Sequence, residues 1–219
     1  MAITAAAFTN GTATNATSAN TANLTWVSSR LYLISCLTYL VAGATEPTCT
    51  GATQFKTQLG NGNQTRLTTF VYVGDGTTHV KTFDCGATTQ TRFQWVVSEW
   101  QGTVTTSNGV DAIVQSVAAM SAGSTTISVT LAAFTDAVNN AVWSVGQNNG
   151  GAAQTEEHAT LSTNSAFFWI EDQYAVGQDT TPSFTISSNA WLSVGAEIKM
   201  ASAGIPAGVL AAILDDEGD

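Results

Sequence analysis

Charged side chains are scarce in this 219-residue chain, and basic side chains are the scarcest. Only 10% of the residues are charged, with six Lys or Arg against sixteen Asp or Glu and a net charge of −10. Globular domains usually carry about 25%. Nucleic acids and anionic membranes are bound largely through Lys and Arg, so neither is an expected partner. The charge favours solubility and a basic or neutral protein partner.

Cysteine and histidine are also rare, with three and two residues. Cys36, Cys49 and Cys85 have an irregular spacing that fits neither a zinc motif nor a disulfide framework. Cys36 lies in the most apolar segment and is expected to be a buried thiol. A disulfide between Cys49 and Cys85 is left open.

Long apolar runs are missing as well. The longest, residues 31–43, has thirteen residues and is too short to span a bilayer. Residues 1–10 have no basic region followed by an apolar core, so no secretory signal is expected there. We therefore expect synthesis in a cytoplasm and no membrane association.

Threonine and other small polar residues take the place of charge. Threonine is β-branched and suits the outward face of a strand, whereas Lys and Glu, the helix surface formers, are depleted. Strand patterns recur about every ten residues, and all-β domains of this length form one unit. We predict an all-β antiparallel β-sandwich, jelly-roll or concanavalin-like, of about ten or eleven strands. The expected strands are Leu24–Ser28, Leu31–Val41, Arg66–Val73, His79–Asp84, Arg92–Trp100, Asp111–Met120, Thr125–Leu131, Ala141–Val145, Ala166–Ile170, Ser183–Ile186 and Trp191–Met200.

The two ends of the chain differ from the sandwich segment, residues 24–200. Residues 1–23 are a Thr/Asn/Ala tract, expected to be an extended arm or an irregular edge strand. Residues 201–219 form a tail with a short helix predicted from Ile205 to Leu214. Its apolar stripe consists of Val209, Leu210, Ile213 and Leu214. The acidic residues that follow oppose the helix dipole, so the tail is either a flexible terminus or a docking peptide.

Catalytic motifs are mostly missing. Neither His79 nor His158 accompanies a G-x-S-x-G nucleophile, so a serine triad is not expected. A pair of Cys85 and His79 has no sequence context that would activate a thiolate, and a surface position in a strand suits His79 better. We predict that the chain is not an enzyme and needs no cofactor.

Acidic residues provide one exception to this prediction. Adjacent acids such as Glu156 and Glu157 point to opposite faces of a strand, whereas a retaining glycosidase needs a pair about 5 Å apart. Glu99 is the single acid of an apolar strand, and pairing with an Arg or a backbone donor is the favoured role for it. Acidic loop positions are too sparse for a calcium loop, and no metal site is predicted. These positions are Asp75, Asp84, Asp111, Asp136, Glu171, Asp172 and Asp179.

Six tryptophans are many for this composition. Trp95 and Trp100 are an odd number of residues apart, so a regular strand places them on opposite faces. Most of the six are expected in the core. If any is exposed, it provides a stacking platform for a sugar, and Trp100 and Trp143 are the candidates.

Three stretches carry a recurrent pattern of strand and turn residues. A strand with Trp95, Val97, Glu99, Trp100 and Gly102 leads into Asp111, Gln115 and Ser116. The segments 128–131 (SVTL), 140–142 (NAV) and 196–198 (AEI) follow. Over residues 25–200 this pattern resembles a β-sandwich module of tailed-bacteriophage virion proteins.

The resemblance implies a non-catalytic sandwich displayed on a phage head or tail. The expected function is a capsid decoration protein on the virion surface, with the major capsid protein, other virion proteins or copies of itself as partners. The stripe at 209–214 and the tract at 2–23 are its candidate docking elements. A carbohydrate-binding module of a tail fibre and a glycan-cleaving enzyme that uses Glu99 are the alternatives.

Overall fold

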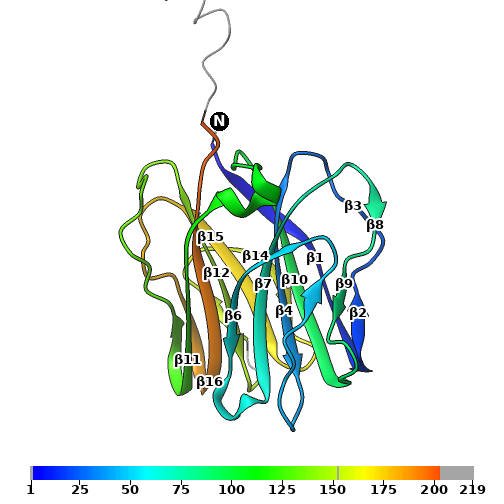
Figure 1. Cartoon of the computed structure of the whole chain (residues 1–219). Coiled ribbons are helices and arrows are strands. Elements are labelled where there is room, and N and C mark those ends of the chain that lie inside the picture. The colour runs from blue at the N-terminus through cyan, green and yellow to red at the C-terminus, as the bar shows by residue number, and fades with distance from the viewer. Residues whose placement is uncertain (1, 152, 203–219) are drawn as a thin grey trace, which may run out of the picture.

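The computed structural model describes residues 2–151 and 153–202, which fold into two packed antiparallel sheets (Figure 1). The first sheet has the order β1-β10-β4-β7-β6. Its strands are β1 (Thr4–Ala16), β4 (Leu31–Tyr39), β6 (Thr53–Leu59), β7 (Thr65–Val73) and β10 (Gln90–Gln101). Every neighbouring pair is antiparallel.

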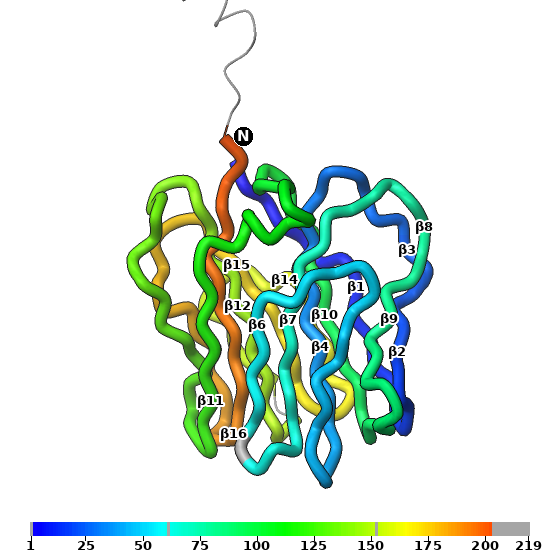
Figure 2. Tube along the Cα trace, viewed as in Figure 1, coloured from blue at the N-terminus to red at the C-terminus, as the bar shows by residue number. Residues whose placement is uncertain are grey.

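The second sheet comes from the other half of the chain and has the order β11-β16-β12-β15-β14. Its strands are β11 (Ile113–Ser128), β12 (Ala141–Asn148), β14 (Ala159–Asn164), β15 (Trp169–Val176) and β16 (Ser183–Ile198), with β13 (Thr155–Glu156) paired to β16. The colours of Figure 2 show this division, because blue to green tube forms one sheet and green to red tube the other. The predicted all-β antiparallel sandwich is confirmed.

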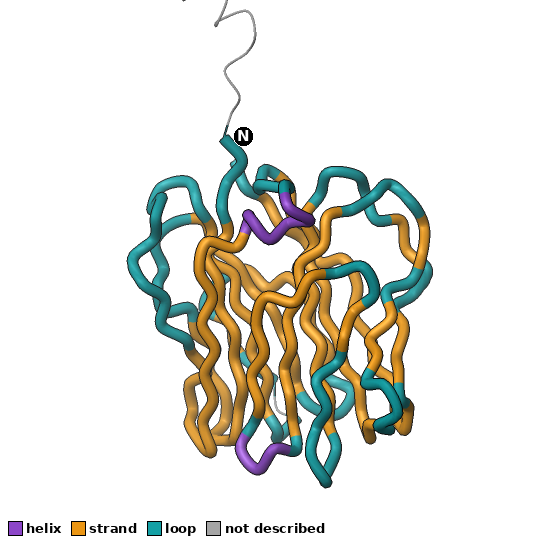
Figure 3. Tube along the Cα trace, in the orientation of Figure 1, coloured by secondary structure: helices purple, strands orange, loops and turns teal. Residues whose placement is uncertain are grey.

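Two small sheets cover the other face of the first sheet (Figure 1). One contains β2 (Ser18–Asn20), β9 (Thr82–Asp84) and β5 (Thr48–Cys49), and the other β3 (Leu24–Thr25) and β8 (Thr78–His79). Helical structure in the described residues is limited to two 3-10 segments at the ends of the sandwich, η1 (Asn61–Asn63) and η2 (Ser107–Ala112) (Figure 3).

The first sheet therefore separates two apolar cores. The inner core lies between the two large sheets and includes Leu33, Trp100 and Trp143. The outer core lies under the small sheets and includes Trp26 and Trp95. Burial on both faces explains why eight of the nine residues of β4 are buried, and why its sequence is a continuous apolar run without alternation.

Side chains close both open edges of the sandwich. At one edge, Asn164 and Ser162 of β14 donate hydrogen bonds to the carbonyls of Gly11 and Thr9 in β1. At the other edge, Lys56 of β6 donates through Nζ to the carbonyl of Ser116 in β11 at 3.1 Å. These bonds occupy edge carbonyls that would otherwise be available to another strand.

The structure corrects the prediction for residues 1–23. Residues 4–16 form β1, which pairs with β10 from Thr4 opposite Gln101 to Ala16 opposite Gln90. The edge-strand alternative is therefore right and the extended arm is wrong. Because residues 4–16 are paired along β10, they do not extend from the domain as an arm.

Two pairs of predicted strands are single strands in the structure. The sequence predicts separate strands at residues 111–120 and 125–131, but residues 113–128 form the single strand β11. Residues 183–186 and 191–198 similarly belong to β16, whereas residues 199–200 lie beyond its end. The register between β11 and β16 shifts at Ser121/Ser124 and again at Ser124/Thr126, so this Ser- and Gly-containing stretch forms irregularities in a continuing ladder.

Candidate functional site

The centre of the sandwich holds a buried carboxyl group, Asp172 of β15, which is fully inaccessible to solvent. Trp143 donates through Nε1 to Asp172 Oδ2 at 3.1 Å, and the backbone N–H of Ser162 donates to Oδ1 at 2.8 Å. Ser98 of the first sheet bonds the same carboxyl group and accepts a hydrogen bond from Trp100 Nε1 at 3.0 Å. Burial raises the pKa of Asp172 to about 6, although these hydrogen bonds oppose the shift.

This network overturns the prediction of a sugar platform at Trp100 and Trp143. Both indoles have no exposed surface. They come from β10 and β12 in opposite sheets, and each points its N–H at the polar network between the sheets. A buried indole needs an acceptor for its N–H, and Ser98 and Asp172 supply one for each ring.

Glu99 lies on the other face of β10, where it binds Arg30 and Tyr32. One carboxylate oxygen forms an ion pair with the Arg30 guanidinium, and the other accepts a hydrogen bond from the Tyr32 hydroxyl at 2.8 Å. Both oxygens therefore have partners, as expected for a structural acid. That the chain is not an enzyme stays a prediction.

Glu197 of β16 is a second fully buried acid. Asn140 Nδ2 donates to it at 2.6 Å, Gln115 Nε2 at 2.8 Å and the backbone N–H of Thr135 at 2.8 Å. Burial alone raises the pKa of such a group, but these hydrogen bonds hold the pKa of Glu197 below its usual range. The carboxylate fastens the 132–140 loop to the second sheet.

The three cysteines are free and buried. Burial raises the pKa of Cys49 and of Cys85 to about 12, and it raises the pKa of Cys36 as well, so all three are neutral thiols. Cys85 Sγ donates to the carbonyl of Thr45, whereas His79 Nε2 faces Asp75 and the Tyr72 hydroxyl. In the described part of the chain, Cys85 and His79 therefore contact other groups and do not form a pair.

Lys81 is a buried cation that the sequence did not reveal. It is 2% exposed, and its Nζ lies 3.2 Å from the ring centroid of Tyr72 and 5.4 Å from that of Trp26. Burial lowers the pKa of Lys81, since the charged form loses hydration. The aromatic faces replace part of that hydration.

Most of the loop acids that were considered for calcium stabilise their own turns. Asp75 Oδ1 accepts from the N–H of Thr77, Asp84 Oδ1 from that of Gly86, and Asp136 Oδ1 from that of Asn139. Asp111 accepts from two neighbouring hydroxyl groups. These carboxylates are too dispersed to share an ion.

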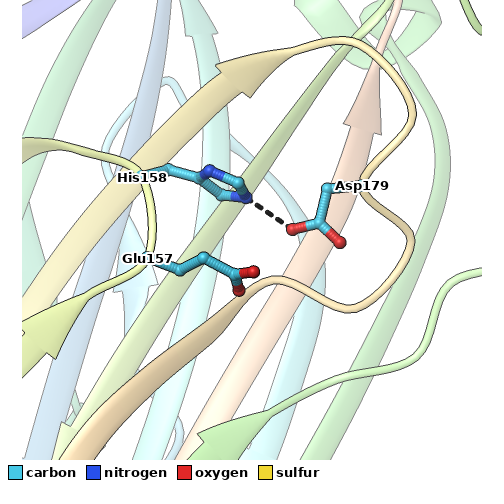
Figure 4. A group of neighbouring side chains, drawn as sticks. All are labelled: Glu157, His158 and Asp179. Carbon is cyan, nitrogen blue, oxygen red and sulfur yellow. Dashed lines mark hydrogen bonds and ion pairs between the residues drawn. The ribbon is translucent and has the colours of Figure 1, made fainter.

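One group of metal-ligating side chains does converge, at Glu157, His158 and Asp179 (Figure 4). Glu157 and His158 lie between β13 and β14, and Asp179 lies between β15 and β16. One ligand atom of each residue lies within 4.8 Å of the other two. His158 Nε2 is 2.5 Å from Asp179 Oδ2, and both side chains are about four-fifths buried, at 18% and 20% exposure.

Sequence reasoning missed this cluster, although it considered each residue. In the sequence, Glu157 is half of an adjacent acidic pair, His158 accompanies no nucleophile motif and Asp179 is one of several scattered loop acids. His158 and Asp179 are separated by twenty-one positions and by two whole strands, β14 and β15. No local spacing motif brings them together, so only the strand pairing reveals the site.

No family model matches this chain, nor does any curated protein. Across the described residues, the structure contains no helix long and apolar enough to cross a membrane. The apolar stripe at Val209, Leu210, Ile213 and Leu214 lies outside the described residues.

Proposed function

We propose that this chain is a virion structural protein, a decoration protein that binds the outer surface of a phage head through the major capsid protein. The observation that carries the proposal is a set of exposed valines at the end of the sandwich where the described chain stops. Val138 is 77% exposed, Val176 49% and Val110 39%. Of the eight large apolar side chains that the described residues expose, these three lie at this one end, where exposed apolar surface suits an interaction with a partner.

Backbone hydrogen bonds connect the segments that carry these valines. Gly177 N–H donates to Asn140 O, and Met200 N–H donates to the side-chain oxygen of Asn140. Lys199 N–H donates to Ala112 O at the end of η2. The loop with Val138, the end of β15 and η2 therefore surround residues 199–202, which Figure 1 shows beside the N-terminus.

The apolar stripe follows in sequence from this end. Residues 203–219 contain Val209, Leu210, Ile213 and Leu214 and then four acids. We propose that the stripe and the valine-bearing end contact the capsid shell together. Because many copies bind one particle, weak individual contacts add up to stable attachment.

The buried chemistry of the domain supports a structural role over the alternatives. Glu99 is occupied by Arg30 and Tyr32, and the two tryptophans proposed as a sugar platform are inside the core. The glycan-binding and glycan-cleaving alternatives thus lose the residues on which they relied.

Deletion of Ile205–Asp219 is expected to leave a folded domain that no longer associates with virions. Removing the apolar stripe takes away buried area, and a loss of only about 1.4 kcal/mol per site weakens binding tenfold. The measurement is cosedimentation of purified protein with intact virions that lack it, with circular dichroism as the test of folding.

Two substitution variants identify the part of the tail that acts. Replacing Val209, Leu210, Ile213 and Leu214 by serine should abolish cosedimentation. Replacing Asp215, Asp216, Glu217 and Asp219 by Asn or Gln keeps the stripe and should preserve it. Undiminished binding after the deletion would exclude the tail as the docking element. A full-length chain that never cosediments would refute the decoration function itself.

A further inference from the structure

We propose that Glu157, His158 and Asp179 bind one divalent transition-metal ion of the zinc type, which links the β13–β14 loop to the β15–β16 loop. The ligands would be His158 Nε2, Asp179 Oδ2 and a carboxylate oxygen of Glu157. The site does not depend on attachment to a virion, and its test uses the isolated chain.

The separations of the ligand atoms suit such an ion after a small adjustment. Zinc binds imidazole nitrogen and carboxylate oxygen at about 2.0–2.2 Å, which places two ligand atoms of a tetrahedral site roughly 3.4 Å apart. The three atoms now lie within 4.8 Å of one another, and His158 Nε2 and Asp179 Oδ2 are 2.5 Å apart. The ion would replace the His158–Asp179 contact and draw in Glu157, which is the exposed member.

The surrounding contacts fix the site while leaving one oxygen of each acid for the metal. Asp179 Oδ1 accepts the N–H of Thr181 at 2.7 Å, so Oδ2 faces the cluster. Glu157 Oε2 accepts the N–H and the hydroxyl of Ser183 at 3.0 and 2.7 Å. Among the described residues, Oε1 of Glu157 has no hydrogen-bond partner, so it is available as a ligand.

The histidine is positioned from the second sheet. Its backbone N–H donates to Gln173 Oε1 at 2.9 Å, and Gln173 is fully buried in β15. Gln173 Nε2 in turn donates to Ser144 Oγ at 3.1 Å and to Ser183 O at 2.9 Å. These bonds join the backbone at His158, and at Ser183 where β16 begins, to the second sheet, as outer contacts do in metal sites.

The ligand set selects the class of ion. Calcium and magnesium prefer sites made of oxygen alone, whereas an imidazole nitrogen favours zinc and its neighbours in the transition series. Two carboxylates balance the charge of a divalent ion. The chain's net charge of −10 also attracts cations in general, so selectivity for zinc over calcium separates a built site from that background.

The test is titration of chelator-treated, full-length protein with zinc, followed by calorimetry and thermal unfolding. We expect one zinc ion per chain and a rise in Tm of roughly 5–10 °C at zinc about 100-fold above its Kd. Calcium and magnesium at the same concentration should leave Tm unchanged.

Isosteric variants locate the bound ion. His158→Gln and Asp179→Asn should each weaken zinc binding by about tenfold or more and reduce the rise in Tm by half or more. Their metal-free Tm values test whether the fold is intact.

The matched control is His79→Gln. His79 Nε2 also lies near an aspartate, 3.3 Å from Asp75, but among the described residues no third His, Cys, Asp or Glu joins that pair. This variant should bind zinc as the parent protein does. No response to zinc, a response that is undiminished in His158→Gln and Asp179→Asn, or one that His79→Gln removes would each overturn the proposal.

Discussion

Replacing Trp26 by alanine is expected to lower the free energy of unfolding by about 3–5 kcal/mol, the range for large buried aromatic residues. Trp26 has no exposed surface. Its ring centroid lies 5.0 Å from that of Phe8, 4.9 Å from that of Tyr32 and 5.4 Å from that of Tyr72. The substitution opens a cavity among these rings and removes the indole N–H bond to the carbonyl of His79.

The comparison for this prediction is Trp169→Ala. Trp169 is a partly exposed tryptophan at the start of β15, and its loss should cost about 1 kcal/mol. Urea unfolding followed by far-ultraviolet circular dichroism suits both variants, because the signal does not depend on the tryptophan removed. Trp26→Phe keeps most ring contacts, so its free energy of unfolding should lie between those of the parent and Trp26→Ala. A loss of only about 1 kcal/mol for Trp26→Ala, as expected for Trp169→Ala, would show that the outer core contributes little to stability.

The outer core matters because it is built on very short strands. β3 and β8 have two residues each, and Trp26 directly follows β3. A two-stranded pair of this length has no stability of its own in water. Burial of Trp26, with backbone bonds from its N–H to Thr77 O and from Gly76 N–H to its carbonyl, keeps this layer on the first sheet.

Strand β10 shows how much of the fold could be predicted from the sequence. The expected strand Arg92–Trp100 lies within β10, and the odd spacing of Trp95 and Trp100 correctly places them on opposite faces. The prediction succeeded because side chains alternate strictly along a strand. The same argument could not show that both faces of β10 are covered. The strands of the two small sheets that cover the outer face are too short to show an alternation of apolar and polar residues.

Irregular pairing and the metal-ligating cluster were beyond the reach of local patterns. The Ser- and Gly-containing segment 121–124 has the composition of a turn, yet it lies within β11. Whether such a segment forms a turn or continues a strand depends on whether the neighbouring strand, here β16, continues beside it. That is a long-range property. The approach of His158 to Asp179 depends on strand pairing in the same way.

The carboxyl group of Asp172 makes the stability of the sandwich depend on pH in an unusual direction. Burial raises its pKa from 3.8 to about 6, so the folded protein holds the proton more tightly than the unfolded chain. Stability therefore falls as pH rises through the interval from about 4 to 6, and the penalty is fully present at neutral pH. A shift of about two pKa units corresponds to about 3 kcal/mol at pH 7.

Asp172→Asn is expected to remove this dependence. Asparagine cannot ionise, so the stability of the variant relative to the parent should improve by about 2 kcal/mol between pH 4 and pH 7. The constant cost of a lost hydrogen bond to Trp143 or Ser162 is the same at both pH values and cancels in the difference. Urea unfolding at a series of pH values measures this difference directly.

The control for this measurement is Asp136→Asn, because its dependence has the opposite sign. A hydrogen bond from the Asn139 side chain, aided by the backbone N–H groups of Val138 and Asn139, lowers the pKa of the exposed Asp136 carboxyl. The ionised Asp136 carboxyl therefore stabilises the folded parent protein above the pKa of the unfolded chain, and this stabilisation is lost as pH falls. Asp136→Asn lacks it, so the variant should lose stability relative to the parent as pH rises. If Asp172→Asn gave a flat difference, or one of the same sign as Asp136→Asn, Asp172 would not be the group that titrates in the core.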